Sequence, residues 1–538
     1  MRTLAALLLS AAAIEASAAL VAEPFPAPEP SEFERSLTGT TVFVKHVRVE
    51  SAASLSAARI AEAVQPFENR RLAAADIHEL QQRLTRLYVE SGYVTSGVLV
   101  AQDGMRGDEL VMQAYEGTVK QVRFAQPPRW SRPQYLTRLL VPDDEEPVHL
   151  GTLQERLAGL RDTGVIDQIN AELVPLARVG ESELVVTVEE PRPFGARIDY
   201  DNHHAPAVGA SRATLVGWHR NLTGWGDSIE ARFGDTEGLR DSTVSYSLPI
   251  PYTRFRIAAR YERSDSLAID PPSFRALDIK ANSTTAVGEI SYAVLRRSSA
   301  ELSVFAAYDR RRTDTTLLGI PFSFVPGIED GSARIEAMRA GAIFASRGES
   351  SVLFSRFQAS FGHTNASDDP TIVGAPAKDF TAAFWQLQYA RRLSFLSSQA
   401  VLRLEGQYTS DILLPLEKYP LGGATTVRGY RENLMLRDRA ALASLEWQAP
   451  ITPSDWKVRL TGALFADVGW GRNMYEAGDT LPRQISSVGV GLIANGPWGL
   501  SGRVYYAVPS RKWLTPNDDL QDRGIHFALS WEATALIP

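Results

Sequence analysis

The chain has 538 residues, a formal net charge of −7 and no cysteine. This length suggests roughly two to four domains, although a large β-barrel can form one long domain. The lack of cysteine excludes disulfides and thiolate metal sites, and the lack of a basic domain or Lys/Arg run gives no indication of nucleic-acid binding.

The N-terminus has the pattern of a secretory signal peptide. Met1-Arg2 precedes an apolar run over residues 4–14, and Ala16-Ser17-Ala18 has the small-residue pattern of a cleavage site. We therefore expect residues 1–18 to be a signal peptide that is removed after Ala18. The alternative, an N-terminal membrane anchor, is disfavoured because the run is too short to span a bilayer. No later stretch has the length and apolarity of a transmembrane helix, so we expect either a soluble extracytoplasmic protein or an outer-membrane barrel.

Residues 19–40 contain several acidic side chains and the prolines Pro24, Pro26, Pro28 and Pro30. This composition predicts an extended linker and not a packed element.

Two small α+β units are expected next, over residues 41–116 and 117–190. Helices are predicted where apolar residues recur at the helical period, over residues 75–91 with Gly92 at the end, and around Leu153, Leu157 and Leu160. Strands are predicted at residues 42–49, 98–100, 109–114, 119–124, 169–173 and 184–188. The shared order amounts to a weak internal repeat with a period of about seventy-five residues.

Residues 191–538 have a different pattern, in which alternating segments are separated by clusters of Gly, Asp, Asn, Ser and Pro. In the segment 254–262, one face carries Phe255, Ile257, Ala259 and Tyr261, and the other carries several charges. A charged face opposite an apolar face is typical of a transmembrane β-barrel with water inside and lipid outside. A soluble sandwich or propeller is the alternative, but it must cover its apolar face with a second sheet.

The predicted fold class is therefore a transmembrane β-barrel preceded by two small α+β domains. From Phe194 onward the chain has room for about 16 antiparallel strands, at about 21 residues per strand and connection. Longer irregular stretches near residues 318–334, 362–378 and 411–438 are predicted to be extracellular loops.

Two motifs in this region contain an arginine and an aspartate that could pair. A Gly-flanked loop contains Gly422, Gly423, Val427, Arg428, Gly429 and Tyr430, and a later alternating segment contains Phe465, Asp467 and Gly469. Asp467 lies mid-strand on the polar face. An arginine and a carboxylate in a secluded setting can form a bidentate, directional clamp, and the glycines supply backbone freedom for a tight loop. The alternative is two unrelated polar residues, one on an exposed loop and one facing a wet lumen.

These residues resemble the Omp85 superfamily of outer-membrane barrels, whose members move or insert other proteins. Val427-Arg428-Gly429-Tyr430 is similar to its loop motif, and Phe465-Ala466-Asp467-Val468-Gly469 to its barrel-wall motif. The order of further motifs resembles one branch, the TpsB transporters of two-partner secretion (ShlB/FhaC/HecB-like haemolysin secretion/activation proteins). Those motifs are Gly92-Tyr93-Val94-Thr95-Ser96, Glu116-Gly117-Thr118-Val119, the segment 170–175 and the turn 221–227.

The resemblance covers nearly the whole mature chain and implies the domain organisation. Residues 41–116 would be the first POTRA domain, residues 117–190 the second, and residues 191–538 the barrel. It also implies that the barrel contacts lipid in the outer membrane of a Gram-negative bacterium, that the POTRA domains lie in the periplasm, and that the Arg428–Asp467 pair holds the loop inside the barrel.

The sequence departs from the family pattern at three places. The segment before the first POTRA domain is short and Pro-rich, so we do not expect the N-terminal helix that often plugs the pore. Gly97 follows the Thr-Ser pair, where the family often has arginine. The chain ends at Pro538 and not on an aromatic residue, with Trp531 the last aromatic side chain.

The function implied by the resemblance is secretion of an unfolded partner exoprotein, a TpsA-like client, which the POTRA domains bind through sheet edges. No enzymatic activity, cofactor, metal, nucleotide or nucleic acid is expected, because the sequence has no P-loop, no zinc-site spacing and no G-x-S-x-G motif. An insertase for outer-membrane proteins is an alternative, and a passive porin is a third, although a porin has no use for tandem POTRA domains.

Overall fold

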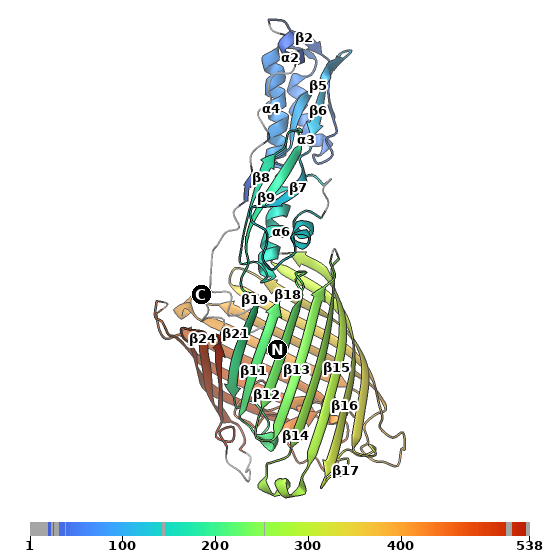
Figure 1. The fold of residues 1–538 in the computed structure, drawn as a ribbon, viewed down its shortest axis with the longest axis vertical. Coiled ribbons are helices and arrows are strands. Elements are labelled where there is room, and N and C mark those ends of the chain that lie inside the picture. Colours follow the sequence, from blue (N-terminus) through green and yellow to red (C-terminus); the bar gives the residue numbers. More distant parts are fainter. Residues whose placement is uncertain are drawn as a thin grey trace. The chain divides into compact units, whose positions relative to one another are not determined.

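The computed structural model describes residues 20–22, 25, 32–37, 39–142, 146–251, 253–297, 299–453, 455–512 and 519–533 (Figure 1). The predicted signal peptide and the chain end from position 534 lie outside these residues. The chain divides into an N-terminal unit, which runs to Pro191 and includes Thr223–Trp225, and a barrel unit formed by Arg192–Leu222 and the chain from Gly226 onward. None of the described helices is long and apolar enough to cross a membrane.

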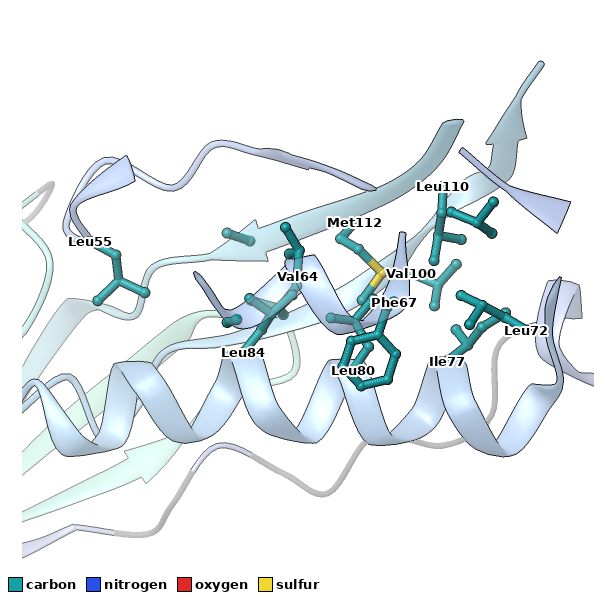
Figure 2. Close-up of a cluster of buried hydrophobic side chains, with 14 of the residues drawn as sticks. Leu55, Val64, Phe67, Leu72, Ile77, Leu80, Leu84, Val100, Leu110 and Met112 are labelled. Carbon is teal, nitrogen blue, oxygen red and sulfur yellow. The ribbon is translucent and has the colours of Figure 1, made fainter. Parts of the chain in front are cut away.

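The first POTRA domain packs helices on a three-stranded sheet. The sheet has the order β3 (His46–Glu50), β6 (Glu109–Tyr115), β5 (Gly97–Arg106). Helix α4 (Ala74–Glu90) turns Ile77, Leu80 and Leu84 toward the sheet, where Leu110 and Met112 complete the buried core (Figure 2). Removing these side chains from water stabilises the domain. Helix α3 (Ala57–Val64) and the pair β2 (Val42–Val44) and β4 (Arg70–Leu72) complete it.

The strand predicted over residues 42–49 is in fact two strands, β2 and β3, with different partners. The break is at Lys45, whose N–H donates to the carbonyl of Asp108 over 2.8 Å. β2 pairs with β4, whereas β3 pairs with β6. The inward-facing positions change phase at this break, from Val42 and Val44 to Val47 and Val49, because each strand pairs with a different partner.

The second POTRA domain repeats the arrangement with helices α5 (Pro133–Leu140) and α6 (Leu150–Asp162). Its strands are β7 (Thr118–Phe124), β8 (Gln168–Pro175) and β9 (Glu181–Glu189). The predicted stripe of Leu153, Leu157 and Leu160 is buried against the sheet. At the joint between the domains, the Gly92 carbonyl accepts from the Leu150 N–H over 2.9 Å.

The segment predicted as an extended linker, residues 19–40, is packed where the structure describes it. β1 (Leu20–Ala22) lies parallel to β8 and extends that sheet to the order β1-β8-β9-β7. Helix α2 (Glu32–Ser36) places Phe33 against the core of the first POTRA domain, together with Leu37. The linker prediction is therefore wrong for these residues. The prolines suggested a loop, but two apolar residues four positions apart give one helical turn an apolar face.

The barrel unit is a closed antiparallel β-barrel of 16 strands, as the alternation and the length of this region predicted (Figure 1). β17 (Ile320–Pro321) only extends the hairpin of β16, which pairs directly with β18. The wall strands are β10 (Phe194–Asp201), β11 (Arg212–Arg220), β12 (Ser228–Asp235), β13 (Leu239–Pro249), β14 (Phe255–Leu267), β15 (Lys280–Arg297), β16 (Ala300–Leu317), β18 (Ser332–Arg347), β19 (Ser351–Thr364), β20 (Asp379–Arg392), β21 (Gln399–Thr409), β24 (Arg439–Pro450), β25 (Arg459–Arg472), β26 (Gln484–Asn495), β27 (Leu500–Pro509) and β28 (Ile525–Glu532).

Side chains alternate between the two faces of the wall. Along β25, Phe465 and Asp467 are buried, whereas Leu464 and Val468 are exposed on the outer, lipid-facing side. β28 pairs with β10 over five residue pairs, from Arg197–Glu532 to Asp201–Ala528, and closes the barrel. This closure brings the last strand beside the first and beside the segment that lies in the lumen.

Candidate functional site: an arginine clamp in the barrel lumen

The chain between β21 and β24, residues 410–438, folds back inside the barrel; we call it the lumen loop. It contains the short pair β22 (Tyr419–Leu421) and β23 (Met435–Arg437). Val427 and Tyr430 pack with Leu421 and with the inward-facing Leu442 and Ile485 of the wall. The loop therefore has its own apolar base on the inner surface of β24 and β26.

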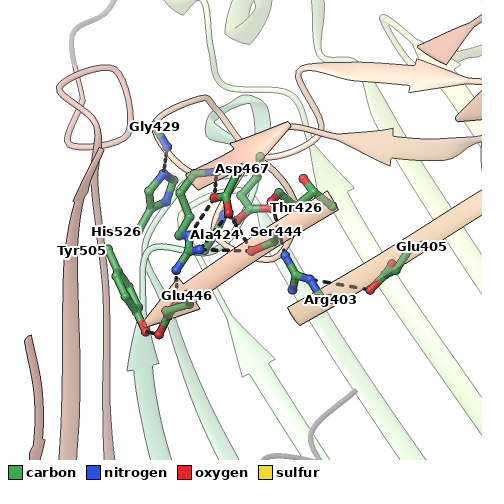
Figure 3. Close-up of polar contacts among 12 residues, drawn as sticks. Arg403, Glu405, Ala424, Thr426, Gly429, Ser444, Glu446, Asp467, Tyr505 and His526 are labelled. Carbon is green, nitrogen blue, oxygen red and sulfur yellow. Dashed lines mark hydrogen bonds and ion pairs between the residues drawn. The ribbon is translucent and has the colours of Figure 1, made fainter. Parts of the chain in front are cut away.

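Arg428 at the tip of the lumen loop is held by two carboxylates of the wall. Its Nε and Nη2 donate to the two oxygens of Asp467, each over 2.8 Å, and its backbone N–H donates to the same carboxylate over 3.1 Å. Nη1 donates to Glu446 of β24. Ser444 donates to Asp467 over 2.7 Å. Figure 3 shows Asp467, Ser444 and Glu446 converging from neighbouring strands.

Two aromatic rings hold the guanidinium of Arg428 in place. Its central carbon lies 3.5 Å from the ring centre of Phe465 and 4.9 Å from that of Tyr505. The two rings meet edge to face, with centroids 5.6 Å apart. Arg428 is only 5 % exposed and Asp467 only 2 %. Contacts of a guanidinium with aromatic faces add to the ion pairs when water is excluded.

Gly429 turns the chain beside the clamp. It has φ of +89°, and an added Cβ would lie 2.8 Å from the Cβ of Ala507, so both the backbone conformation and the space require glycine. Its N–H donates to Nε2 of the fully buried His526 on β28 over 2.9 Å. The last strand of the barrel therefore also holds the tip, and only β26 and β27 separate it from β25, which carries Asp467.

Further ion pairs fix the lumen loop at other points. Arg431 donates to Asp522, in the loop between β27 and β28, and to Asp270, in the loop between β14 and β15, each over 2.7 Å. Glu417 accepts from Arg339 of β18 over 2.8 Å. Because β18 and β25 are separated by several strands on either side of the ring, the loop is attached to distant parts of the wall and crosses the lumen.

A cavity of about 1250 Å³, lined by both charged and apolar residues, lies next to the clamp. Its lining combines Arg428 and Glu446 with residues at the ends of strands on the side of the barrel where β10 begins, among them Arg392, Asn495 and Glu532. A charged cavity can hold an extended polypeptide with its backbone groups hydrated. Over the described ranges, no group of three or more His, Asp or Glu side chains is placed to hold a metal ion.

The structure brings together both motifs that the sequence pointed to. Arg428 meets Asp467, Gly422 and Gly423 have φ of +103° and +108°, and Gly469 lies beside Val427, with a built Cβ 2.9 Å from the Val427 side chain. Four further residues of the site were not predicted from the sequence: Glu446, Ser444, Tyr505 and His526. Each of the four occupies an inward position of an alternating strand, but that signal is shared by every lumen-facing residue.

We expect His526→Leu to loosen the tip of the lumen loop, because the Gly429 N–H loses its acceptor. Leaving a buried donor unsatisfied costs about 1–3 kcal/mol, so trypsin cleavage of the purified protein at Arg428 and Arg431 should rise roughly tenfold. His526→Gln is the matched control, since its side-chain oxygen can accept. Equal cleavage rates in wild type and His526→Leu would show that the histidine does not support the tip.

The comparison with known families assigns the chain. The family described as haemolysin secretion/activation protein ShlB/FhaC/HecB matches residues 180–494, more than half of the chain, and the ShlB-type POTRA domain matches residues 42–117. The chain belongs to the ShlB/FhaC/HecB family. Members of this family are outer-membrane transporters, and this protein is accordingly placed in the outer membrane with its POTRA domains in the periplasm.

Individual members of the family agree with this assignment. The outer membrane transporter CdiB of Dickeya dadantii is 21% identical over 509 residues, which cover 91% of this chain and 87% of that protein. The heme/hemopexin transporter protein HuxB of Haemophilus influenzae is 21% identical over 80% of this chain and 77% of that protein. The structure of CdiB from Escherichia coli superposes with a TM-score of 0.67 at 17% identity, over 95% of this chain and 94% of that one, and shares the fold.

Proposed function

We propose that this ShlB/FhaC/HecB protein binds an unfolded partner exoprotein through its POTRA domains, over residues 41–116 and 117–190, and secretes it through the barrel without ATP. The observation that carries the proposal is the lumen loop, which crosses the barrel and is clamped at its tip beside a cavity lined by both charged and apolar residues. A conduit for a polypeptide needs a path that is closed at rest and can be opened. Relatives named as a heme/hemopexin transporter and an outer membrane transporter support a secreted client.

In this proposal the lumen loop is the gate of the barrel, and the ion pairs of Arg428 hold it in the closed position. While Arg428 is in place, its charge compensates Asp467 and Glu446, which would otherwise be buried carboxylates without a cation. Withdrawal of the loop would expose both carboxylates to the water of the lumen, where they can be hydrated. The cost of release is thereby limited, and the entering chain occupies the vacated space.

Direction must come from the client, because the sequence contains no nucleotide-binding loop. We propose that folding of the exoprotein outside the cell prevents its return and biases its passage outward. In this proposal the outer-membrane lipid solvates the apolar outer surface of the barrel and takes no other part in transport.

The alternative within the superfamily is an insertase that assembles other outer-membrane proteins. The experiment that separates the two is a comparison of the secreted and outer-membrane proteomes with and without the gene. Loss of one large exoprotein, retained or degraded in the periplasm, is the expected result and would name the client. Depletion of many barrel proteins would overturn secretion in favour of the insertase.

A further inference from the structure

The described residues of the N-terminal segment contact both POTRA domains at three points. β1 pairs in parallel with β8, with Leu20 opposite Ala171 and Ala22 opposite Leu173. Phe25 is buried at 8 % exposure, and its N–H donates to the carbonyl of Val94 over 3.0 Å. Phe33 in α2 is the third anchor. The segment therefore covers a sheet edge of the second domain, and Phe25 occupies a space over Gly97 in the first domain, which we call the Gly97 slot.

The slot for Phe25 exists because residue 97 is glycine. A Cβ built at Gly97 would lie 2.3–2.7 Å from three carbons of the Phe25 ring, closer than atoms can approach. Gly104 forms a similar seat, where a Cβ would lie 2.4 Å from the ring of Phe33. Gly97 is the position at which the family resemblance leads one to expect arginine. Glycine at this position permits the docking of Phe25, since a side chain would fill the space that its ring occupies.

The edge that β1 covers is the edge of this sheet best suited to accept another strand. Without β1, one side of β8 would present unpaired N–H and C=O groups, which is the usual template for strand addition. The opposite edge, β7, is partly occupied by a bridge between Thr118 and Pro147 and carries the exposed charges of Lys120 and Arg123. β1 contributes only three residues to the pairing, so a longer segment can replace it.

We propose that the β8 edge together with the Gly97 slot is the docking site for the client. In the absence of client, β1 and Phe25 of the same chain occupy this site and must be displaced. The partner that this site fits is an extended segment of an unfolded polypeptide that runs parallel to β8 and carries an aromatic residue shortly after the paired stretch, as Phe25 follows Ala22. This inference rests on the proposed function, because it names the site where the exoprotein binds.

The test uses the purified full-length protein and a fluorescein-labelled synthetic peptide with the sequence of residues 19–27, ALVAEPFPA. Fluorescence anisotropy should show that Phe25→Ala protein binds the peptide at least fivefold more tightly than wild type, because the ring of Phe25 no longer fills the slot. The double variant Phe25→Ala/Gly97→Ala should lose this gain, since the new methyl group fills the slot. A second variant without residues 20–22 should gain affinity as Phe25→Ala does.

Phe43→Ala is the matched control, because Phe43 is an exposed phenylalanine of β2, at 45 %; it should bind the peptide as wild type does. Equal affinity for wild type and Phe25→Ala, or a gain that survives Gly97→Ala, would overturn the proposal. The result does not depend on secretion. If the peptide binds as expected but removal of the gene costs no exoprotein, the proposed function fails and the docking edge stands. If an exoprotein is lost but the peptide distinguishes none of the variants, the docking edge fails and the proposed function stands.

Discussion

Replacement of Arg428 by alanine should reduce secretion of the client at least about tenfold while the barrel still assembles. The substitution leaves Asp467 and Glu446 in a buried site without their cation, and removal of one partner from a buried ion pair costs about 3–5 kcal/mol. The tip of the lumen loop can escape this cost by leaving its site, whereas the wall is held by the hydrogen bonds of 16 strands. We therefore expect an intact barrel in which the detached loop has no fixed position and obstructs the path of the client.

The measurement is the ratio of client in the medium to client in the cells, with barrel assembly followed by heat-modifiable migration on gels. Arg260→Ala is the matched control, because Arg260 is an arginine of β14 that is half exposed and lies 3.9 Å from Glu262; such pairs contribute little. Arg428→Lys tests the geometry, since a lysine cannot reproduce the fork to Asp467 together with the contact to Glu446. Normal secretion by Arg428→Ala would show that the clamp is not needed for transport.

Tethering the lumen loop to the wall should block secretion in a way that a reductant reverses. A Cβ built at Gly469 would lie 2.9 Å from Cγ2 of Val427. In a disulfide, with an S–S bond of about 2.05 Å, the Cβ of one cysteine is roughly 3 Å from the sulfur of the other. The double variant Val427→Cys/Gly469→Cys should therefore crosslink once the Leu421 side chain shifts, because its Cδ2 also lies 2.9 Å from the built Cβ. If the loop must leave its site, oxidation should reduce secretion at least about tenfold.

The protein has no cysteine of its own, so maleimide labelling after reduction reports only the engineered pair. Each single cysteine variant shows the effect of its substitution alone, and the reduced double variant shows the effect of both without the tether. If the fully crosslinked protein secretes as much client as the same protein after treatment with reductant, the loop stays in place during transport. The gate would then have to be sought elsewhere in the lumen.

Much of the architecture was predictable because a membrane barrel imposes a rule on every residue of its wall. Each strand must alternate between lipid and water, so segments such as Phe255–Tyr261 indicated the fold and approximate strand number. The long helices of the POTRA domains could also be predicted, for example from Ile77, Leu80 and Leu84. An apolar stripe of that length at the helical period indicates an amphipathic helix packed on a core. Short elements such as α3 and α5, each of eight residues, lack that redundancy and were missed.

The order of the domains, the alternation of the wall and the two short motifs that contain Arg428 and Asp467 can be read from the sequence, and the family resemblance joins the two motifs in one site. Only the tertiary structure decided that Glu446 shares the guanidinium, that His526 supports Gly429 and that Phe25 fills a slot over Gly97. The physical reason is the same in all three cases. Periodicity and composition are local, whereas these contacts join residues that only barrel closure or docking of the N-terminal segment brings within reach.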